Sequence, residues 1–211
     1  MKKLFLVLSI FISLHYLANA QENNNHPEKG KAGIHYSSFG DNQVVYFEDM
    51  VGTPSYNGQQ FYVLGVDYLY PINNWLDIET GIEYAYHKIR IDPFLPSGSN
   101  VKPFTTQISL INMPVLLRVN VWKYFFFNGG MVLSMDASND NSIDNQTGIG
   151  ANLGLGFQYD FETGISLFIT PYLKANTLVP FSPEEHQQRL MENGLRLGIM
   201  YEFSGHNRLN K

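Results

Sequence analysis

His35 and Ser37 are side chains that could together cleave an ester bond. They stand two positions apart, and successive side chains of a strand leave on opposite faces, so both would share one strand face. A histidine that takes the serine proton converts the hydroxyl into a nucleophile. The sequence assigns no acidic third member to this pair. We therefore expect His35 and Ser37 to be structural strand residues, with ester hydrolysis as an alternative.

A larger group of ionisable residues recurs at alternate positions of extended segments. Such a group could form ion pairs, line a narrow conduction path or relay a proton, for example between Glu83 and His87. Isolated buried charges are costly, so we expect mainly a structural ion-pair network around Arg118, Lys174 and Arg196. The full group is Asp67, Asp77, Glu79, Glu83, His87, Arg118, Asp160, Lys174, Arg196 and Glu202.

Metal and cofactor chemistry has little support. Asp140, Ser142 and Asp144 have the one-three-five spacing of a calcium loop, but Asn145 replaces the glycine at position six and Ala151 the glutamate at position twelve. This pattern indicates a polar loop. The chain has no cysteine, which excludes disulfides, thiolate metal sites and a cysteine nucleophile. We expect no metal and no cofactor.

The charged group lies on segments that alternate with period two. In residues 76–87, LDIETGIEYAYH, apolar or bulky residues take the even positions and polar or small residues the odd ones. Similar alternation recurs up to residue 203, and glycine concentrates on the polar face, as a narrow barrel interior requires. Pro114 cannot donate a ladder hydrogen bond and predicts a bulge or local distortion. The predicted strands are 32–39, 60–70, 76–91, 104–121, 124–135, 149–161, 164–176 and 194–203.

The connections between these strands alternate in length. Three are tight, near residues 71–75, 122–123 and 162–163, and four are long, at 40–59, 92–103, 136–148 and 177–193. Short periplasmic turns and long extracellular loops are typical of outer-membrane barrels, and both termini would then be periplasmic. The last loop carries a helix-capping pattern, with Ser182 at the N-cap, Pro183 and Glu185. Aromatic residues beside the short turns predict a girdle at the lipid–water interface, formed by Tyr70, Trp75, Trp122, Tyr124, Tyr159 and Phe161.

The N-terminal sequence predicts secretion. Two lysines, the apolar run 4–17 and Ala18-Asn19-Ala20 form a signal peptide, residues 1–20, which would be cleaved before Gln21. Residues 21–31 would be a periplasmic segment, 32–203 the barrel and 204–211 a periplasmic tail. Removal of the peptide leaves 12 basic and 19 acidic residues, a net charge of −7. This balance argues against nucleic acid as a partner.

Two resemblances add to this reading. Arg196, Gly198, Tyr201 and Phe203 resemble the C-terminal signal that the barrel-assembly machinery reads, although eight residues follow Phe203. Residues 32–203 resemble the small porin-like outer-membrane β-barrel family of Bacteroidetes, through segments 75–81, 112–115, 124–130, 150–157 and 198–203. The resemblance implies the fold, an outer-membrane location and contact with its lipid, and proline is frequent in the strand that holds Pro114. It specifies no activity, and nothing singles out the branch of the family that resembles secretion-system assembly factors.

These observations predict an all-β fold, an eight-stranded antiparallel up-and-down transmembrane β-barrel. We expect a monomer with a side-chain-filled lumen, a structural or loop-mediated binding role and no catalysis. The sequence does not identify a partner for the extracellular loops. The alternatives are an outer-membrane lipid-modifying hydrolase that uses His35 and Ser37, a narrow ion channel, and a soluble lipocalin-like binder with an apolar interior.

Overall fold

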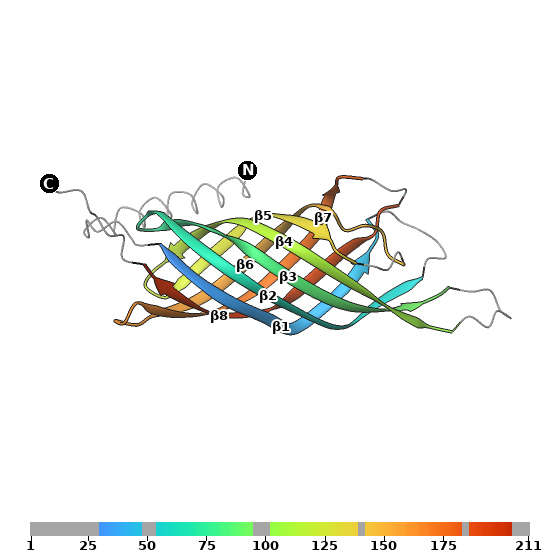
Figure 1. The fold of residues 1–211 in the computed structure, drawn as a ribbon, viewed down its shortest axis with the longest axis horizontal. Coiled ribbons are helices and arrows are strands. Elements are labelled where there is room, and N and C mark those ends of the chain that lie inside the picture. Colours follow the sequence, from blue (N-terminus) through green and yellow to red (C-terminus); the bar gives the residue numbers. More distant parts are fainter. Residues whose placement is uncertain (1–29, 48–53, 95–101, 139–141, 183–185, 204–211) are drawn as a thin grey trace, which may run out of the picture.

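Eight antiparallel strands form a closed barrel (Figure 1). The computed structural model of the chain describes residues 30–47, 54–94, 102–138, 142–182 and 186–203. Each strand pairs with the next, and β8 pairs with β1 to complete the ring, which confirms the predicted fold. Among the described residues, no helix is long and apolar enough to cross a membrane. The strands are β1 (Lys31–Val45), β2 (Ser55–Asn73), β3 (Leu76–Asp92), β4 (Phe104–Val121), β5 (Phe125–Asp136), β6 (Gly148–Asp160), β7 (Ile165–Pro180) and β8 (Arg189–Glu202).

The connections alternate in length as predicted. Residues 74–75, 122–124 and 161–164 form one end of the barrel, called here the short-turn end. Residues 46–54, 93–103, 137–147 and 181–188 connect the strands at the long-loop end. Trp122 adopts a left-handed backbone conformation, with φ of 57°, and Gly164 one with φ of 80°; both lie in short turns.

The strands extend further toward the long-loop end than the sequence predicted. Residues 189–193, expected in the last loop, belong to β8, so the helix predicted from Ser182 is wrong there; Pro183 and Glu185 lie outside the described residues. The reason is tertiary. Leu190 pairs with Val44 of β1, and both side chains are buried inside the barrel, a burial that outweighs a local capping pattern.

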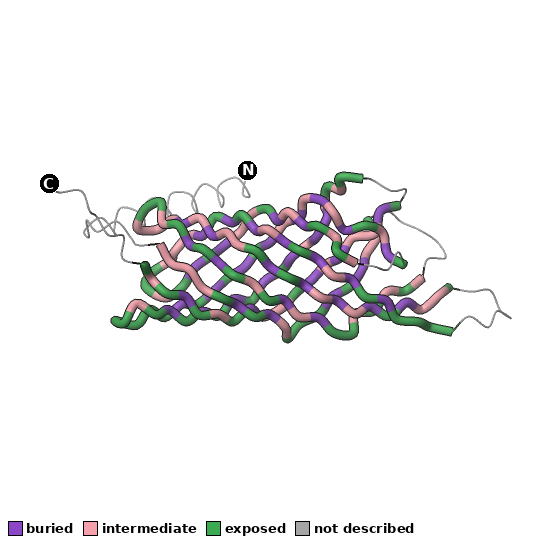
Figure 2. Tube along the Cα trace, in the orientation of Figure 1, coloured by how far each residue is buried: buried purple, intermediate pink, exposed green. Residues whose placement is uncertain are grey.

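Buried residues alternate with exposed or partly exposed ones along most of each strand (Figure 2). In β3, Ile82 and Tyr84 are 58% and 41% exposed, whereas Glu79 and Glu83 are 1% and 3% exposed. The charged side chains therefore face the interior and the apolar side chains face outward. A lipocalin-like binder would have the opposite arrangement, so that alternative is not supported.

The polarity of the two faces reverses near the long-loop end. Beyond His87, Ile89 and Ile91 face inward while Lys88 and Arg90 take the outer positions of β3. The apolar outer band of β3 thus runs from Leu76 to Tyr86. These eleven residues span ten steps, and a rise of ~3.3 Å per step at a strand tilt of about 40° gives a height of roughly 25 Å, the height of the apolar band of outer-membrane barrels.

Pro114 interrupts the ladder between β3 and β4. The register has partners at Thr80–Val115 and at Glu83–Asn112, with none between, and it is the same on both sides of the gap. Local distortion is confirmed, but a bulge is not formed. Thr80 Oγ1 donates to the Pro114 carbonyl at 2.9 Å, so a side chain occupies part of the gap.

Glycines on the inner face leave room for aromatic rings. A Cβ at Gly156 would overlap the ring of Phe126, and a Cβ at Gly198 would overlap the ring of Phe168. The outward-facing Gly129 differs, because a Cβ there would meet only the end of the Leu153 side chain closely. Interior glycines are thus part of the packing, since they allow a narrow barrel to contain phenylalanine.

We expect Gly156→Ala to destabilise the barrel by about 1–3 kcal/mol, because the new methyl group must displace the buried Phe126 ring. Gly129→Ala, the matched control, should change stability by less than about 0.5 kcal/mol. Urea-induced unfolding in lipid vesicles, followed by tryptophan fluorescence, measures both variants. Equal effects at the two positions would contradict this account of the interior.

Candidate functional site

Glu79 of β3 is the centre of a buried ion-pair network in the lumen. Its carboxylate accepts a hydrogen bond from Arg196 Nη2 of β8 and another from Asn128 Nδ2 at 3.1 Å. Arg118 of β4 approaches two carboxylates of β3. Its Nη1 lies 4.0 Å from Glu79 Oε2, and its Nε lies 3.9 Å from Asp77 Oδ2. Four strands on different sides of the barrel are thereby connected through its interior.

A second part of the network surrounds Glu83. Lys174 Nζ lies 3.1 Å from Glu83 Oε2 and 3.4 Å from Glu192 Oε1, so one ammonium group serves two carboxylates. His35 Nδ1 lies 2.6 Å from Asp67 Oδ2, and its Nε2 lies 3.6 Å from Glu83 Oε1. The Nδ1 contact is a hydrogen bond, whereas the Nε2 contact is too long to be one.

Glu192 of β8 connects this part to residues nearer the long-loop end. It accepts a hydrogen bond from the hydroxyl of Tyr172, and its Oε2 lies 3.2 Å from His87 Nε2. His87 Nδ1 in turn lies 3.3 Å from Asn42 Nδ2. Because Asn42 presents a donor amide there, the neutral His87 ring would accept at Nδ1, and its Nε2 faces Glu192 without a hydrogen bond.

Eight of the ten ionisable residues that the sequence grouped together lie buried in this interior. Asp160 does not: β6 ends there, its side chain is 51% exposed, and it pairs with Lys31 at 2.9 Å on the rim. Glu202 is half-buried at the end of β8. Sequence reasoning missed Glu192 because it assigned 177–193 to a loop. Alternation continued backward from Arg196 through Gly194 would have placed Glu192 on the inner face.

Apolar clusters lie at both ends of the network. Near the short-turn end, Arg118 stacks 3.5 Å above the Phe126 ring, and Arg196 lies 5.6 Å from the Phe168 ring. These rings join Leu69 and Met200 in one buried cluster. At the long-loop end the inner face is apolar, with Val44, Phe61, Val63, Ala85, Ile89, Ile91, Ile108, Leu110, Ile143 and Leu190. The charges are thus enclosed between two hydrophobic layers.

The described part of the connection between β5 and β6 packs against the interior at the long-loop end. Ile143 joins the apolar cluster, and Gln146 is fully buried. The Gln146 side chain donates to the carbonyl of Gln188 at 2.9 Å and accepts from the amide of Leu190 at 3.1 Å. One glutamine therefore joins this connection to the start of β8.

No calcium site forms among the described residues of this connection. Asp144 accepts a hydrogen bond from the amide of Gln188 at 2.8 Å, and Asp140 lies outside the described residues. Among the described residues, no group of three or more histidine and acidic side chains could hold a metal ion.

Tyr56 lies beyond the apolar band, near the same end of the barrel. Burial raises the pKa of Tyr56 above its ordinary value, and its hydrogen bond with Tyr46 adds to the rise.

The geometry of His35 and Ser37 does not match a hydrolytic pair. Ser37 Oγ lies 2.6 Å from the Tyr172 hydroxyl, whereas His35 bonds to Asp67 and faces Glu83. His35 is 3% exposed and Ser37 1% exposed, both inside the barrel. Both side chains are thus buried and bonded to other partners, so the hydrolase alternative gains no support.

Aromatic residues, including those of the predicted girdle, lie around the short-turn end. Tyr124 stacks on Tyr159 at a centroid distance of 5.9 Å, and Tyr159 contacts Phe161 edge to face at 4.8 Å. Tyr70 and Trp122 are exposed. Tyr124 and Trp75 are half-buried. A second group, which sequence reasoning missed, lies where the outer polarity reverses and consists of Tyr62, Tyr84 and Tyr86.

The residues of the predicted assembly signal lie on both faces of β8. Arg196 is buried in the network and Gly198 leaves room for the Phe168 ring. Tyr201 and Phe203 are exposed and contact each other edge to face at 5.6 Å. Recognition of this segment by the assembly machinery stays a prediction.

Removal of one partner from the Glu79–Arg196 pair should destabilise the barrel strongly. We expect Arg196→Met to cost about 3–5 kcal/mol, because the Glu79 carboxylate stays buried without its guanidinium. Glu79→Gln combined with Arg196→Met should recover part of the loss. Lys31→Met, which breaks the more exposed pair with Asp160, should cost about 0–1 kcal/mol. Unfolding midpoints in urea compare the variants, and an Arg196→Met barrel as stable as Lys31→Met would refute the role of the network.

The fold has counterparts among solved structures, although no protein-family model and no curated protein sequence matches the chain. The crystal structure of the outer membrane protein OprG from Pseudomonas aeruginosa is 12% identical, with a TM-score of 0.54 over 85% of this chain and 98% of that one. The solid-state NMR structure of the outer membrane protein AlkL in lipid bilayers is 13% identical, with a TM-score of 0.54 over 90% of this chain and 97% of that one. At these identities the likeness concerns the fold alone, and the chain has the eight-stranded barrel fold that is found in outer membrane proteins.

Proposed function

We propose that this chain is an integral outer-membrane barrel with a closed lumen, whose role is structural or is carried by its long-loop end. The observation that carries the proposal is the inverted distribution of side chains. An exposed apolar band surrounds the barrel, and the charges are enclosed within it. OprG and AlkL, which share the fold, are outer membrane proteins.

The apolar band argues for a lipid environment. Leu153, Met131 and Val115, on three neighbouring strands, are 59%, 62% and 55% exposed. Soluble monomers seldom expose contiguous apolar patches above ~600 Å², and this band continues around the ring. Tyrosines at one edge and tryptophans, tyrosines and phenylalanines at the other fit the two lipid–water interfaces.

The orientation and processing follow from the same proposal. The short turns would be periplasmic and the long loops extracellular, so the first residue of β1 and the last of β8 would face the periplasm. The signal peptide, residues 1–20, and the tail, residues 204–211, lie outside the described residues, and both stay predictions. Membership of the Bacteroidetes-type family is likewise a prediction.

Binding by the long-loop end is supported by exposed phenylalanines. Phe47, Phe94 and Phe181 lie at or beyond strand ends there and are 59%, 67% and 57% exposed. Large aromatic side chains are enriched in protein interfaces and depleted from solvated surfaces. We therefore propose that any recognition by this protein occurs at this end.

A charge placed on the apolar band should distinguish a membrane barrel from a soluble one. We expect Leu153→Arg to destabilise the folded barrel in vesicles by about 2–4 kcal/mol, since the guanidinium would lie in lipid. Gln107 lies on the outer face beyond the band, and Gln107→Arg should lower the free energy of unfolding by only about 0–1 kcal/mol. Chemical denaturation in vesicles gives both values. A harmless Leu153→Arg would overturn the membrane location.

The closed lumen predicts little ionic conduction. Purified protein in planar lipid bilayers should give no steady conductance steps, because paired charges and two apolar clusters fill the interior. A general porin recorded in the same bilayers is the positive control. Reproducible steps from the folded protein would support the narrow-channel alternative in place of a closed barrel.

A further inference from the structure

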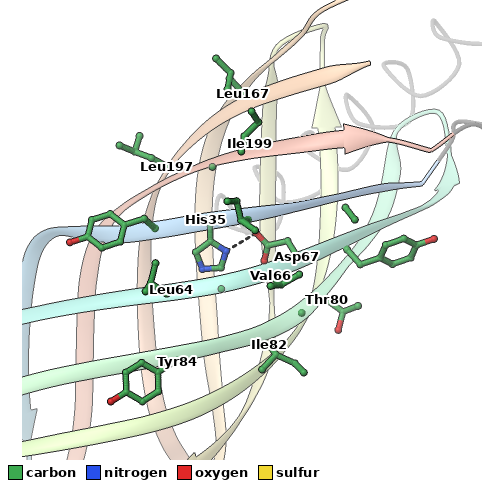
Figure 3. A pocket seen from close by; sticks show the side chains of 17 residues that line it. His35, Leu64, Val66, Asp67, Thr80, Ile82, Tyr84, Leu167, Leu197 and Ile199 are labelled. Atoms are coloured by element: carbon green, nitrogen blue, oxygen red, sulfur yellow. Dashed lines mark hydrogen bonds and ion pairs between the residues drawn. The ribbon is translucent and has the colours of Figure 1, made fainter. Parts of the chain in front are cut away.

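A groove of about 1240 Å³ lies on the outer face of the barrel, across β7, β8, β1, β2 and β3 (Figure 3). His35 and Asp67, which reach toward each other between β1 and β2, are among its lining residues. Their side chains have no exposure, so only their main chain can contribute to the groove. The groove is therefore a feature of the outer wall, separated from the lumen network by one layer of backbone.

A single row of aliphatic residues runs along the groove. Leu167 pairs with Ile199, Ile199 with Ile34, Ile34 with Val66, and Val66 with Ile82. Each member is directly opposite the next, and all five are on the outer face. Five strands spaced ~4.8 Å apart give this row a length of roughly 19 Å.

Aromatic residues border the row on both sides. The next row toward the long-loop end contains Tyr36 and Tyr84, each paired with Leu64. The next row toward the short-turn end contains Tyr68, paired with the smaller Ala32 and Thr80. Branched aliphatic side chains between larger rings form an elongated depression with apolar walls.

The direction of the groove fits a chain that enters from one membrane interface. Leu167 and Ile199 lie two and three residues from the short-turn ends of β7 and β8, whereas Ile82 lies six residues into β3. A cross-strand row is inclined to the membrane plane by the strand tilt, about 40°. The row thus rises by roughly 12 Å, from near the short-turn interface toward the middle of a hydrocarbon core about 30 Å thick.

We propose that this groove binds one acyl chain of a phospholipid from the leaflet at the short-turn end. The inference deepens the proposed function and rests on it, because it requires the outer face to be in lipid. The apolar lining, the length of the row and its continuity with the lipid-facing band all fit an acyl chain. Burial of the chain against the row gains contact area that a convex barrel wall does not offer.

The test is lipid retention by the full-length mature protein. Wild-type protein is inserted into vesicles of phosphatidylethanolamine and phosphatidylglycerol, extracted in mild detergent, and examined by native mass spectrometry. Ile34→Trp fills the centre of the groove, and Leu153→Trp is the matched control on β6, because Ile34 and Leu153 are 60% and 59% exposed. Heat-modifiable gel migration verifies that each variant is folded.

We expect a phospholipid adduct on the wild type and on Leu153→Trp, and at least about a tenfold loss of it on Ile34→Trp. Equal retention by both variants, or loss from both, overturns the groove as the binding site. Insertion without any retained phospholipid also overturns it and leaves the proposed function intact. A wild-type protein that does not enter the vesicles overturns both proposals.

Discussion

The structure depends on the pairing of β8 with β1. This ladder leaves no free edge in the described sheet, so backbone groups along the strands can bond without water. Closure with eight strands has a second consequence, because the enclosed space is only wide enough for side chains. Each inward-facing side chain must therefore be small, pack against a neighbour, or carry a charge that is paired.

The lumen meets this constraint in layers. Glu79 and Glu83 lie four residues apart on β3, and each is matched with a cation from the opposite wall, Arg196 and Lys174 respectively. Rings of Phe126 and Phe168 fit over glycines and beneath guanidinium groups at the short-turn end. At the long-loop end the interior becomes apolar as the exterior becomes polar. The barrel thus has an apolar outer wall around its charged interior, and the opposite arrangement at the long-loop end.

The sequence predicted the fold well because period-two alternation is local. A polar face with glycines and isolated charges, opposite an aliphatic and aromatic face, is readable in 76–87 and 149–160 without any knowledge of contacts. The limits of prediction were also physical. The extension of β8 to Arg189 depends on the pairing of Leu190 with Val44, more than a hundred residues away, whereas the capping pattern at Ser182 is local. Glu192 was missed for the same reason.

The contacts within the site were beyond sequence reasoning. Alternation placed Glu83 and His87 on one face, but it did not show that Lys174 would join Glu83 to Glu192, or that His35 would lie between Asp67 and Glu83. Such partners are set by barrel closure and strand stagger. The outer groove is also invisible in the sequence, because its row of aliphatic residues comes from five strands.

A barrel with lipid outside and its charges inside is tested most directly by a spin-label scan of the outer positions of β3. The chain has no cysteine, so single cysteines can be introduced at outer positions of β3, from 78 to 90, without labelling at any other residue. Collision with oxygen reports exposure to lipid, and collision with a water-soluble nickel complex reports exposure to water. We expect high oxygen access at 78, 82 and 84, and water access at 88 and 90. Water access at 82 and 84 would contradict a lipid-facing outer wall.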